Sequence, residues 1–369
     1  MKVLHLTTHL NVGGITSYLY HLSQGLKKIG IQTAIASSGG EYSPEFESCQ
    51  IPIHVIPLNT KSELSPKLGI SFLKLKRLHQ KEKWDVLHAH TRVGQCLAQA
   101  LSSYCNIPYV TTFHGFYHLD HLGRKLFPCL GKKTIANSHA VASNLKTFYP
   151  KYKNQITTVL HGINTDFFNP SAISDSQKEE WRHKLGLAAW PTLGIVGRLS
   201  PEKGHVQLLE IFKILLESYH HKAQLLIVGD GNQKEWIEKK ILELELKEYV
   251  KLIPSQKDPR PLFALMDIYV TYHSGPEGFG LSTLEAMAMG KPVIISYVQG
   301  GMGDFIEDGQ EGFLMKGASQ NTMAQKINEL LNSKSLQLTM GTKAAQKIKA
   351  HFSYQRMAEQ TQKIYEQCL

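Results

Sequence analysis

The sequence predicts an α/β protein built from two doubly wound, Rossmann-like domains that face each other across a cleft. Its 369 residues exceed the length at which one hydrophobic core usually keeps growing, which favours two domains. Short apolar runs alternate with helical stretches, and this alternation stops once and then restarts. Two successive parallel sheets are therefore expected. Ligands of such sheets bind beyond the carboxyl ends of the strands.

The first series of strands is expected in a domain of residues 1–168. Its β-branched or leucine-rich runs lie near residues 3, 33, 86, 109, 134 and 157. The polar segment SAISDSQKEEWRHKLGL after Pro170 is predicted to be a linker with a short helix. A second series near residues 193, 224, 249, 268, 291 and 312 predicts a second domain over residues 169–352.

The composition excludes several classes of protein. Hydrophobic residues make up 42% of the chain and charged residues 20%, which is ordinary for a globular protein. No stretch approaches the roughly 18 apolar residues of a membrane-spanning helix, and the N-terminal stretch lacks a signal-peptide cleavage site, so a cytoplasmic protein is expected. The five cysteines form no C-x-x-C pair, which argues against a disulfide framework or a zinc site.

The positive charge is concentrated in the first half of the chain. Residues 1–168 hold 18 Lys and Arg against 8 Asp and Glu, whereas residues 169–369 hold 23 of each, so the first half carries the whole formal charge of +10. A one-sided basic domain indicates an anionic partner, either a nucleic acid or a phospholipid surface. A basic surface that only keeps the protein soluble is the alternative.

The strongest candidate site is the run from Glu277 to Glu285, which follows the strand predicted near residue 268. Glycines in this run let the backbone approach a ligand closely, and the helix that begins there directs free N–H groups toward an anion. The two glutamates would accept hydrogen bonds from sugar and ribose hydroxyls, with phosphates held between them. Two solvated glutamates on a surface helix are the alternative. The donor-binding residues predicted in this run are Gly278, Phe279, Gly280, Leu281 and Glu285.

A second phosphate-binding candidate is the turn from Gly197 to Gly204, between a predicted strand and a helix. Arg198 and Lys203 in this turn would neutralise the charge that develops on a diphosphate leaving group. The sequence has no D-x-D pair to hold a divalent metal, so we expect no metal and no cofactor, only a nucleotide sugar as co-substrate. A basic turn without a ligand is the alternative, although cations at a helix N-terminus oppose its dipole.

Glycines and histidines near strand ends are the candidates of the first domain. Gly13 and Gly14 join the first strand to a helix and resemble a phosphate-approach loop, but they complete no G-x-G-x-x-G fingerprint, which disfavours an NAD enzyme. His114 ends its strand at the cleft and could contact the substrate; a purely structural histidine is the equal alternative. Three more histidines lie at or just after strand ends: His88, His90 and His118. The first two could begin a zinc site, but no carboxylate or cysteine completes it at a familiar spacing.

Taken together, these motifs resemble those of the retaining family-4 glycosyltransferases, which have the GT-B fold. The resemblance covers nearly the whole chain, and the two glutamates with the arginine and lysine upstream are its most specific part. In chain order the motifs are Gly13-Gly14, Thr112-Phe113-His114-Gly115, Asn137-Ser138, His161-Gly162-Ile163-Asn164, Arg198, Lys203, Glu277 to Glu285 and Gly300-Gly301. One departure is Gly303-Asp304 after the paired glycines, where relatives often have a glutamate.

The resemblance implies a retaining, metal-independent hexosyltransferase that uses a UDP- or GDP-sugar. The first domain would bind the acceptor and the second the nucleotide sugar. Four side chains take catalytic roles by this resemblance: His114 and Glu277 at the transferred sugar, and Arg198 and Lys203 at the diphosphate. Glu285 would bind the ribose, and Gly14 would lie against the phosphates. Residues 353–369 resemble the terminal helix of the family, which returns to the first domain.

Two stretches of the first domain suit an anionic membrane surface, because they mix cations with apolar residues. Residues 64–84 and 124–133 both have this character. We expect peripheral contact with the inner face of the plasma membrane and a glycan or lipid-linked acceptor, as in the synthesis of lipopolysaccharide or another cell-surface glycan. An amphipathic core helix with a solvated basic face is the alternative.

Other functions remain open from the sequence. A nucleotide-sugar epimerase or a phosphorylase can share two facing α/β domains, but neither an acid and base pair for the first nor a pyridoxal-phosphate lysine for the second is identifiable. A non-catalytic sugar-nucleotide-binding protein would bind without turnover. An RNA-binding protein would interleave aromatic residues with the basic stretches, and these are sparse there, so no nucleic-acid partner is expected.

Overall fold

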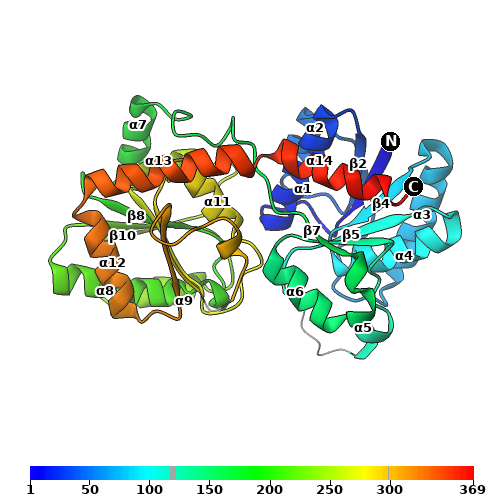
Figure 1. The fold of residues 1–369 in the computed structure, drawn as a ribbon. Helices are drawn as coiled ribbons and strands as arrows, with labels where there is room; N and C mark the ends of the chain where they lie inside the picture. The colour runs from blue at the N-terminus through cyan, green and yellow to red at the C-terminus, as the bar shows by residue number, and fades with distance from the viewer. Residues whose placement is uncertain (117–121, 298) are drawn as a thin grey trace. The chain divides into compact units, whose positions relative to one another are not determined.

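The computed structural model describes residues 1–116, 122–297 and 299–369. It divides the chain into two compact units, residues 1–162 with 352–369 and residues 163–351. Each unit has a parallel sheet with helices on both faces (Figure 1), which confirms the predicted α/β class with two doubly wound sheets. Residues 163–168, which we expected in the first domain, lie in the second unit, where the Phe168 ring packs against Phe263.

The strands described in the first unit form one sheet in the order β3-β2-β1-β4-β5-β6-β7. They are β1 (Lys2–Leu6), β2 (Gln32–Ser37), β3 (Ile53–Val55), β4 (Val86–Ala89), β5 (Tyr109–Phe113), β6 (Lys133–Ala136) and β7 (Ile156–Thr158). Strands β1, β4 and β5 are buried along almost their whole length, as expected where helices cover both faces. The edge strand β3 was missed because its short sequence, IHV, is only partly buried.

The helices of the first unit include the last helix of the chain. They are α1 (Gly14–Lys28), α2 (Ser43–Ser48), α3 (Pro66–Glu82), α4 (Arg92–Cys105), α5 (Leu122–Leu126), α6 (His139–Phe148), the 3-10 helix η1 (Pro150–Gln155) and α14 (Tyr354–Glu366). Tyr18 and Leu22 of α1 share a hydrophobic cluster with Met357 and Tyr365 of α14. This packing confirms the predicted return of the terminal helix.

The strands described in the second unit have the order β10-β9-β8-β11-β12-β13. They are β8 (Thr192–Val196), β9 (Gln224–Val228), β10 (Val250–Ile253), β11 (Ile268–Tyr272), β12 (Val293–Tyr297) and β13 (Gly312–Lys316). The helices are α7 (Asp175–Leu185), α8 (His205–Tyr219), α9 (Lys234–Glu243), α10 (Arg260–Leu265), α11 (Leu281–Ala288), α12 (Gln320–Leu331) and α13 (Lys334–His351), with 3-10 helices η2 (Pro201–Lys203) and η3 (Met302–Asp304). The polar segment predicted as a linker with a short helix contains α7, which Ser174 and Gln177 cap.

The strand order of each sheet reverses at one place, which we call its switch point. The chain first builds outward from β1 to β3 and then resumes on the other side of β1 with β4; β8 and β11 repeat this pattern in the second unit. Loops that leave the carboxyl ends of these neighbouring strands diverge, so ligands of doubly wound sheets bind there. Among the helices of the described residues, none combines the length and apolar character needed to span a membrane.

Candidate functional site

The switch point of the second unit brings together the two charged sequences predicted to bind phosphate and sugar. The loop after β8 ends at Gly204, and the loop after β11 runs from His273 to Gly280. Ser274 joins these loops, because its N–H donates to the carbonyl of Glu202 at 3.1 Å and its hydroxyl to that of Pro201 at 2.7 Å. The side chains of both loops therefore lie on one surface.

Gly204 makes this close approach of the two loops feasible. Its φ of 62° lies in the left-handed region, which favours glycine. A Cβ at this position would stand 1.7 Å from the carbonyl oxygen of Tyr272. Any side chain would therefore separate the two loops.

An ion pair between Lys203 and Glu277 lies at the centre of this surface. The Lys203 Nζ donates a hydrogen bond to Glu277 Oε2, and the side chains are only 23% and 16% exposed. Burial alone would raise the pKa of Glu277, but the positive charge of Lys203 and its hydrogen bond hold this pKa below its ordinary value. Glu277 is therefore ionised at neutral pH.

The buried imidazole of His273 is a site residue that the sequence analysis missed. Its Nδ1 lies 3.5 Å from Glu277 Oε2. Burial lowers the pKa of His273 to about 4, so a neutral ring faces the carboxylate. Its position at the end of β11, four residues before Glu277, was the available signal.

The loop after β12 holds the backbone of Glu277. The N–H of Glu277 donates to Gln299 at 2.9 Å, and the N–H of Gly301 donates to the Glu277 carbonyl at 3.2 Å. A Cβ on Gly300 would stand 2.7 Å from that carbonyl oxygen. Gly300, the first of the paired glycines singled out in the sequence, thus allows a third loop to reach the site.

Helix α11 begins at Leu281, after the loop that holds Glu277, and carries Glu285 on its second turn. Gly280 caps the helix with a φ of 96°, which only glycine adopts at little cost. The side chain of Phe279 packs on Phe305 with ring centroids 4.9 Å apart, so Phe279 offers a ligand only its backbone. Glu285 is 8% exposed, and burial raises its pKa to about 8. The alternative of two solvated glutamates is therefore wrong.

Arg198 occupies the outer part of the same surface. Its side chain is 69% exposed, and its Nη2 lies 2.6 Å from Oε1 of Glu202. Both predicted phosphate-binding cations therefore pair with carboxylates of this surface, Lys203 with Glu277 and Arg198 with Glu202.

The corresponding switch point of the first unit carries the other candidates. Gly13 caps α1, and a Cβ on either Gly13 or Gly14 would meet no atom of the described residues within 4 Å. Packing within this unit therefore does not require glycine at these two positions.

His114 directly follows β5, is half-buried, and its Nε2 lies 3.4 Å from Nδ1 of His90. Burial lowers the pKa of His114 to about 3, so its ring is neutral. Close by, ring nitrogens of His5, His88 and His90 lie within 4.8 Å of one another, a spacing compatible with a metal ion. Their nitrogens also make hydrogen bonds, to each other or to hydroxyl groups. His118 lies outside the described residues.

Two protein families match the chain, one on each side of the linker. Glycosyltransferase Family 4 matches residues 12–167, and Glycosyl transferases group 1 matches residues 177–347. The capsular polysaccharide biosynthesis glycosyltransferase CapM of Staphylococcus aureus is 27% identical over 99% of this chain and 96% of its own length.

Solved structures show the same fold. A glycosyltransferase from Rickettsia africae superposes with a TM-score of 0.86 at 23% identity, over 100% of this chain and 98% of its own. Anabaena HepE in complex with UDP-glucose superposes with a TM-score of 0.85 at 22% identity, over 100% of both chains.

Proposed function

Because this chain is a glycosyltransferase with the GT-B fold, whose two halves belong to Glycosyltransferase Family 4 and Glycosyl transferases group 1, we propose that it transfers a hexosyl group with retention. The donor is a UDP- or GDP-sugar, and the acceptor is a glycan or a lipid-linked glycan of the cell surface. The observation that carries this proposal is the Lys203–Glu277 pair at the switch point of the second unit.

The charged groups of this switch point match the parts of a nucleotide sugar. Lys203 and Arg198 bind the diphosphate, and backbone N–H groups at the start of α11 add to this anion site. Glu277 accepts hydrogen bonds from the transferred sugar, and Glu285 binds the ribose. In this proposal the diphosphate replaces carboxylates as the partner of both cations, which frees Glu277 for the sugar hydroxyls.

Retention follows when the acceptor attacks the face from which the nucleotide departs. The bond between the anomeric carbon and the phosphate oxygen breaks, the acceptor oxygen bonds to that carbon, and a donor phosphate oxygen takes the acceptor proton. Lys203 and Arg198 stabilise the negative charge that develops on the departing diphosphate. No side chain forms a covalent intermediate in this scheme.

Because two cations neutralise the diphosphate, the proposal includes no metal. EDTA at millimolar concentration should leave the transfer rate within about twofold of its starting value, since no step depends on the ion. A rate that EDTA abolishes and Mg²⁺ or Mn²⁺ restores would contradict this part of the proposal.

The first unit contributes neutral groups. His114 forms a hydrogen bond with the transferred sugar, and the open space around Gly13 and Gly14 supports a close approach of donor phosphates to the backbone.

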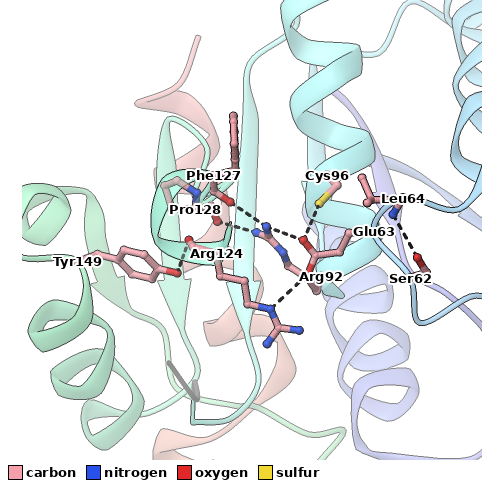
Figure 2. Close-up of polar contacts among 9 residues, drawn as sticks. All are labelled: Ser62, Glu63, Leu64, Arg92, Cys96, Arg124, Phe127, Pro128 and Tyr149. Atoms are coloured by element: carbon pink, nitrogen blue, oxygen red, sulfur yellow. Dashed lines mark hydrogen bonds and ion pairs between the residues drawn. The ribbon is translucent and has the colours of Figure 1, made fainter. Parts of the chain in front are cut away.

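The surface around Glu63 supports a lipid-linked acceptor. Glu63 accepts from Arg92 at 2.9 Å and from Arg124 at 3.2 Å, and Arg92 also donates to the carbonyl of Phe127 at 2.8 Å (Figure 2). These contacts fix the segment after α5 beside the segment before α3. Leu64 and Phe127, which lie on these segments, are 93% and 71% exposed.

Exposed cations and apolar side chains continue along the neighbouring helices. Helix α3 buries one face in the first unit's core, and its exposed residues include Lys67, Ile70, Leu73, Lys74 and Arg77. Apolar groups that insert at the headgroup level, surrounded by cations, favour an anionic bilayer. We infer peripheral binding to the inner face of the plasma membrane, in lipopolysaccharide or another cell-surface glycan pathway.

Vesicle sedimentation tests the membrane part. The protein should sediment with phosphatidylglycerol vesicles at low salt but not with phosphatidylcholine vesicles. Phe127→Ser should weaken binding to the phosphatidylglycerol vesicles at least fivefold. Trp236→Ser is the matched control, because Trp236 is a half-exposed aromatic residue of the second unit. Failure of the wild-type protein to sediment, or equal loss in both variants, would contradict the proposed surface.

A panel of nucleotide sugars tests the enzymatic part. UDP-glucose comes first, because the structurally similar HepE was crystallised with it. We expect at least one UDP- or GDP-hexose to raise the Tm and to be hydrolysed slowly without an acceptor. The anomeric configuration of the transferred product, read by NMR, should equal that of the donor. An inverted product would contradict retention.

A further inference from the structure

Two cysteines of the first unit lie beside the ion pair of Arg92 and Glu63. Cys96 stands one turn after Arg92 on α4, and its Sγ lies 3.9 Å from Oε2 of Glu63 (Figure 2). Arg92 also donates to the carbonyl of Pro128 at 2.9 Å, and Cys129 is the next residue. The thiols of Cys96 and Cys129 form a hydrogen bond with each other. Two cysteines that are far apart in the sequence thus meet at one point.

The surrounding contacts hold the backbone of Cys129 in this place. Its φ of 50° lies in the left-handed region, which residues other than glycine seldom adopt. The hydrogen bonds of Arg92 to the carbonyls of Phe127 and Pro128 fix the segment directly before it. A conformation of this kind persists only where the surrounding structure maintains it. The meeting of the two thiols is therefore a built feature of the first unit.

The two thiols have different electrostatic surroundings. The hydrogen bond from Cys96 and the positive charge of Arg92 hold the pKa of the Cys129 thiol below its ordinary value. The same hydrogen bond, burial and the carboxylate of Glu63 raise the pKa of Cys96. The thiolate therefore forms first on Cys129, while Cys96 stays protonated.

This arrangement is typical of cysteines that react with oxidants. The thiolate is the nucleophilic form of cysteine, and oxidation-sensitive cysteines often combine a lowered pKa with a second thiol close by. The pair is not sealed from solvent, because Cys96 is half-buried and the Glu63 side chain beside it is 29% exposed. Cys129 itself is 9% exposed, which favours a small oxidant.

We propose that Cys96 and Cys129 are a thiol oxidation site, which a hydroperoxide such as hydrogen peroxide converts into a reversible disulfide. Cys129 reacts with the peroxide, and Cys96 resolves the product. No step uses a nucleotide sugar, so this inference stands or falls independently of the proposed function.

The reaction proceeds in two steps. The Cys129 thiolate attacks one peroxide oxygen, the O–O bond breaks, and the departing hydroxide takes up a proton to become water. The Cys96 sulfur then attacks the sulfenic acid on Cys129, the S–O bond breaks, and the hydroxyl leaves as a second water with the Cys96 proton. The two sulfurs together lose two electrons, and the peroxide gains them.

Peptide mapping of the full chain under non-reducing conditions tests the site. The reduced protein is treated with a small molar excess of hydrogen peroxide, the peroxide is removed with catalase, and free thiols are alkylated in urea. We expect a peptide pair joined through Cys96 and Cys129, with alkylation confined to Cys49, Cys105 and Cys368. Dithiothreitol should restore both thiols. Alkylated Cys96 and Cys129, or a disulfide between other cysteines, would overturn the proposal.

Single substitutions assign the two roles. In Cys96→Ser the sulfenic acid on Cys129 has no resolving thiol and should be trapped by dimedone, whereas in Cys129→Ser the thiol of Cys96 should survive the same treatment. Cys105→Ser is the matched control, because Cys105 is a half-buried cysteine of the same helix, and it should form the disulfide as the wild type does. If a variant does not fold, dimedone added to the wild type during the reaction should label Cys129. Label on Cys96 instead would overturn the assignment.

The same treatment of the unfolded chain separates a folded contact from chance pairing. In urea the yield of the Cys96–Cys129 peptide pair should fall roughly tenfold, because closing the loop between the two thiols then costs chain entropy. An equal yield in urea would show that the fold does not bring these thiols together for reaction, and it would overturn the proposal.

Discussion

The two switch points have the same strand order but different chemistry. In the second unit, ionised groups meet between β8 and β11, with Lys203 against Glu277 and Arg198 against Glu202. In the first unit, neutral imidazoles meet between β1 and β4, among them His5 and His90. One topology thus supports an ionic site and a site of uncharged hydrogen bonds.

The comparison indicates that the backbone topology determines where a site forms, whereas the side chains determine which ligand it can bind. A diphosphate needs counter-charge, which the second switch point supplies in a partly buried setting, where charges interact more strongly than in water. A sugar offers hydroxyls, which neutral donors and acceptors can recognise. Substitutions at each switch point test whether ionic and neutral groups have these separate roles.

Lys203→Met should have the largest effect, because it removes a phosphate cation and leaves the ionised Glu277 buried and unpaired. We expect kcat/KM to fall by about 10³-fold, nucleotide affinity to fall with it, and stability to drop by about 3 kcal/mol in urea titrations. Lys213→Met is the control, since Lys213 pairs with Glu217 on α8 away from the site. Equal losses of kcat/KM and nucleotide affinity in both variants would contradict a special role of the switch point.

Glu277→Gln should affect transfer while sparing nucleotide binding. The loss of the charged acceptor for sugar hydroxyls is expected to lower kcat about 10²-fold, whereas the Kd for the free nucleoside diphosphate stays within about threefold. Glu311→Gln perturbs another buried pair, with Lys347 at 3.0 Å, and should alter stability alone. A large rise in the nucleotide Kd for Glu277→Gln would mean that this carboxylate belongs to the nucleotide half of the site.

His114→Phe tests the neutral switch point. Removing one hydrogen bond to the sugar should lower kcat by about tenfold and leave nucleotide diphosphate binding unchanged. If His114→Phe weakened nucleotide binding as much as Lys203→Met does, the division between an ionic and a neutral site would fail.

Glu285→Gln should change the pH dependence of stability. Burial raises the folded-state pKa of Glu285 to about 8, so the folded state binds more protons than the unfolded state between about pH 4.5 and 8. The contribution of Glu285 is therefore largest at low pH and is lost as the pH rises through this window. Stability of the wild type relative to Glu285→Gln should fall by up to about 1.4 kcal/mol per pH unit. A flat difference in urea titrations would show that Glu285 is ionised throughout.

The sequence predicted the strands and most of the charged residues because these signals are local. Apolar runs, glycines and the spacing of Glu277 and Glu285 need no knowledge of distant segments. The ion pair between Lys203 and Glu277 could not be predicted from the sequence, because the two residues lie 74 positions apart. Only the pairing of β8 with β11 brings them together. The links from His5 to His114 arise in the same way from three neighbouring strands.

Weak local signals account for the remaining differences. Strand β3 is three residues long and partly exposed, so it has neither the length nor the alternation of a typical strand. The close approach at Gly204 involves the carbonyl oxygen of Tyr272, which a Cβ would meet at 1.7 Å and which lies far away in the sequence.

Hydrogen exchange measured with and without the nucleotide sugar selected from the panel tests the central claim most directly. The account predicts that the donor slows exchange in the loops of residues 197–204 and 273–285, and that Lys203→Met abolishes this protection. Protection confined to other segments, or unchanged by Lys203→Met, would contradict a donor site at the switch point of the second unit.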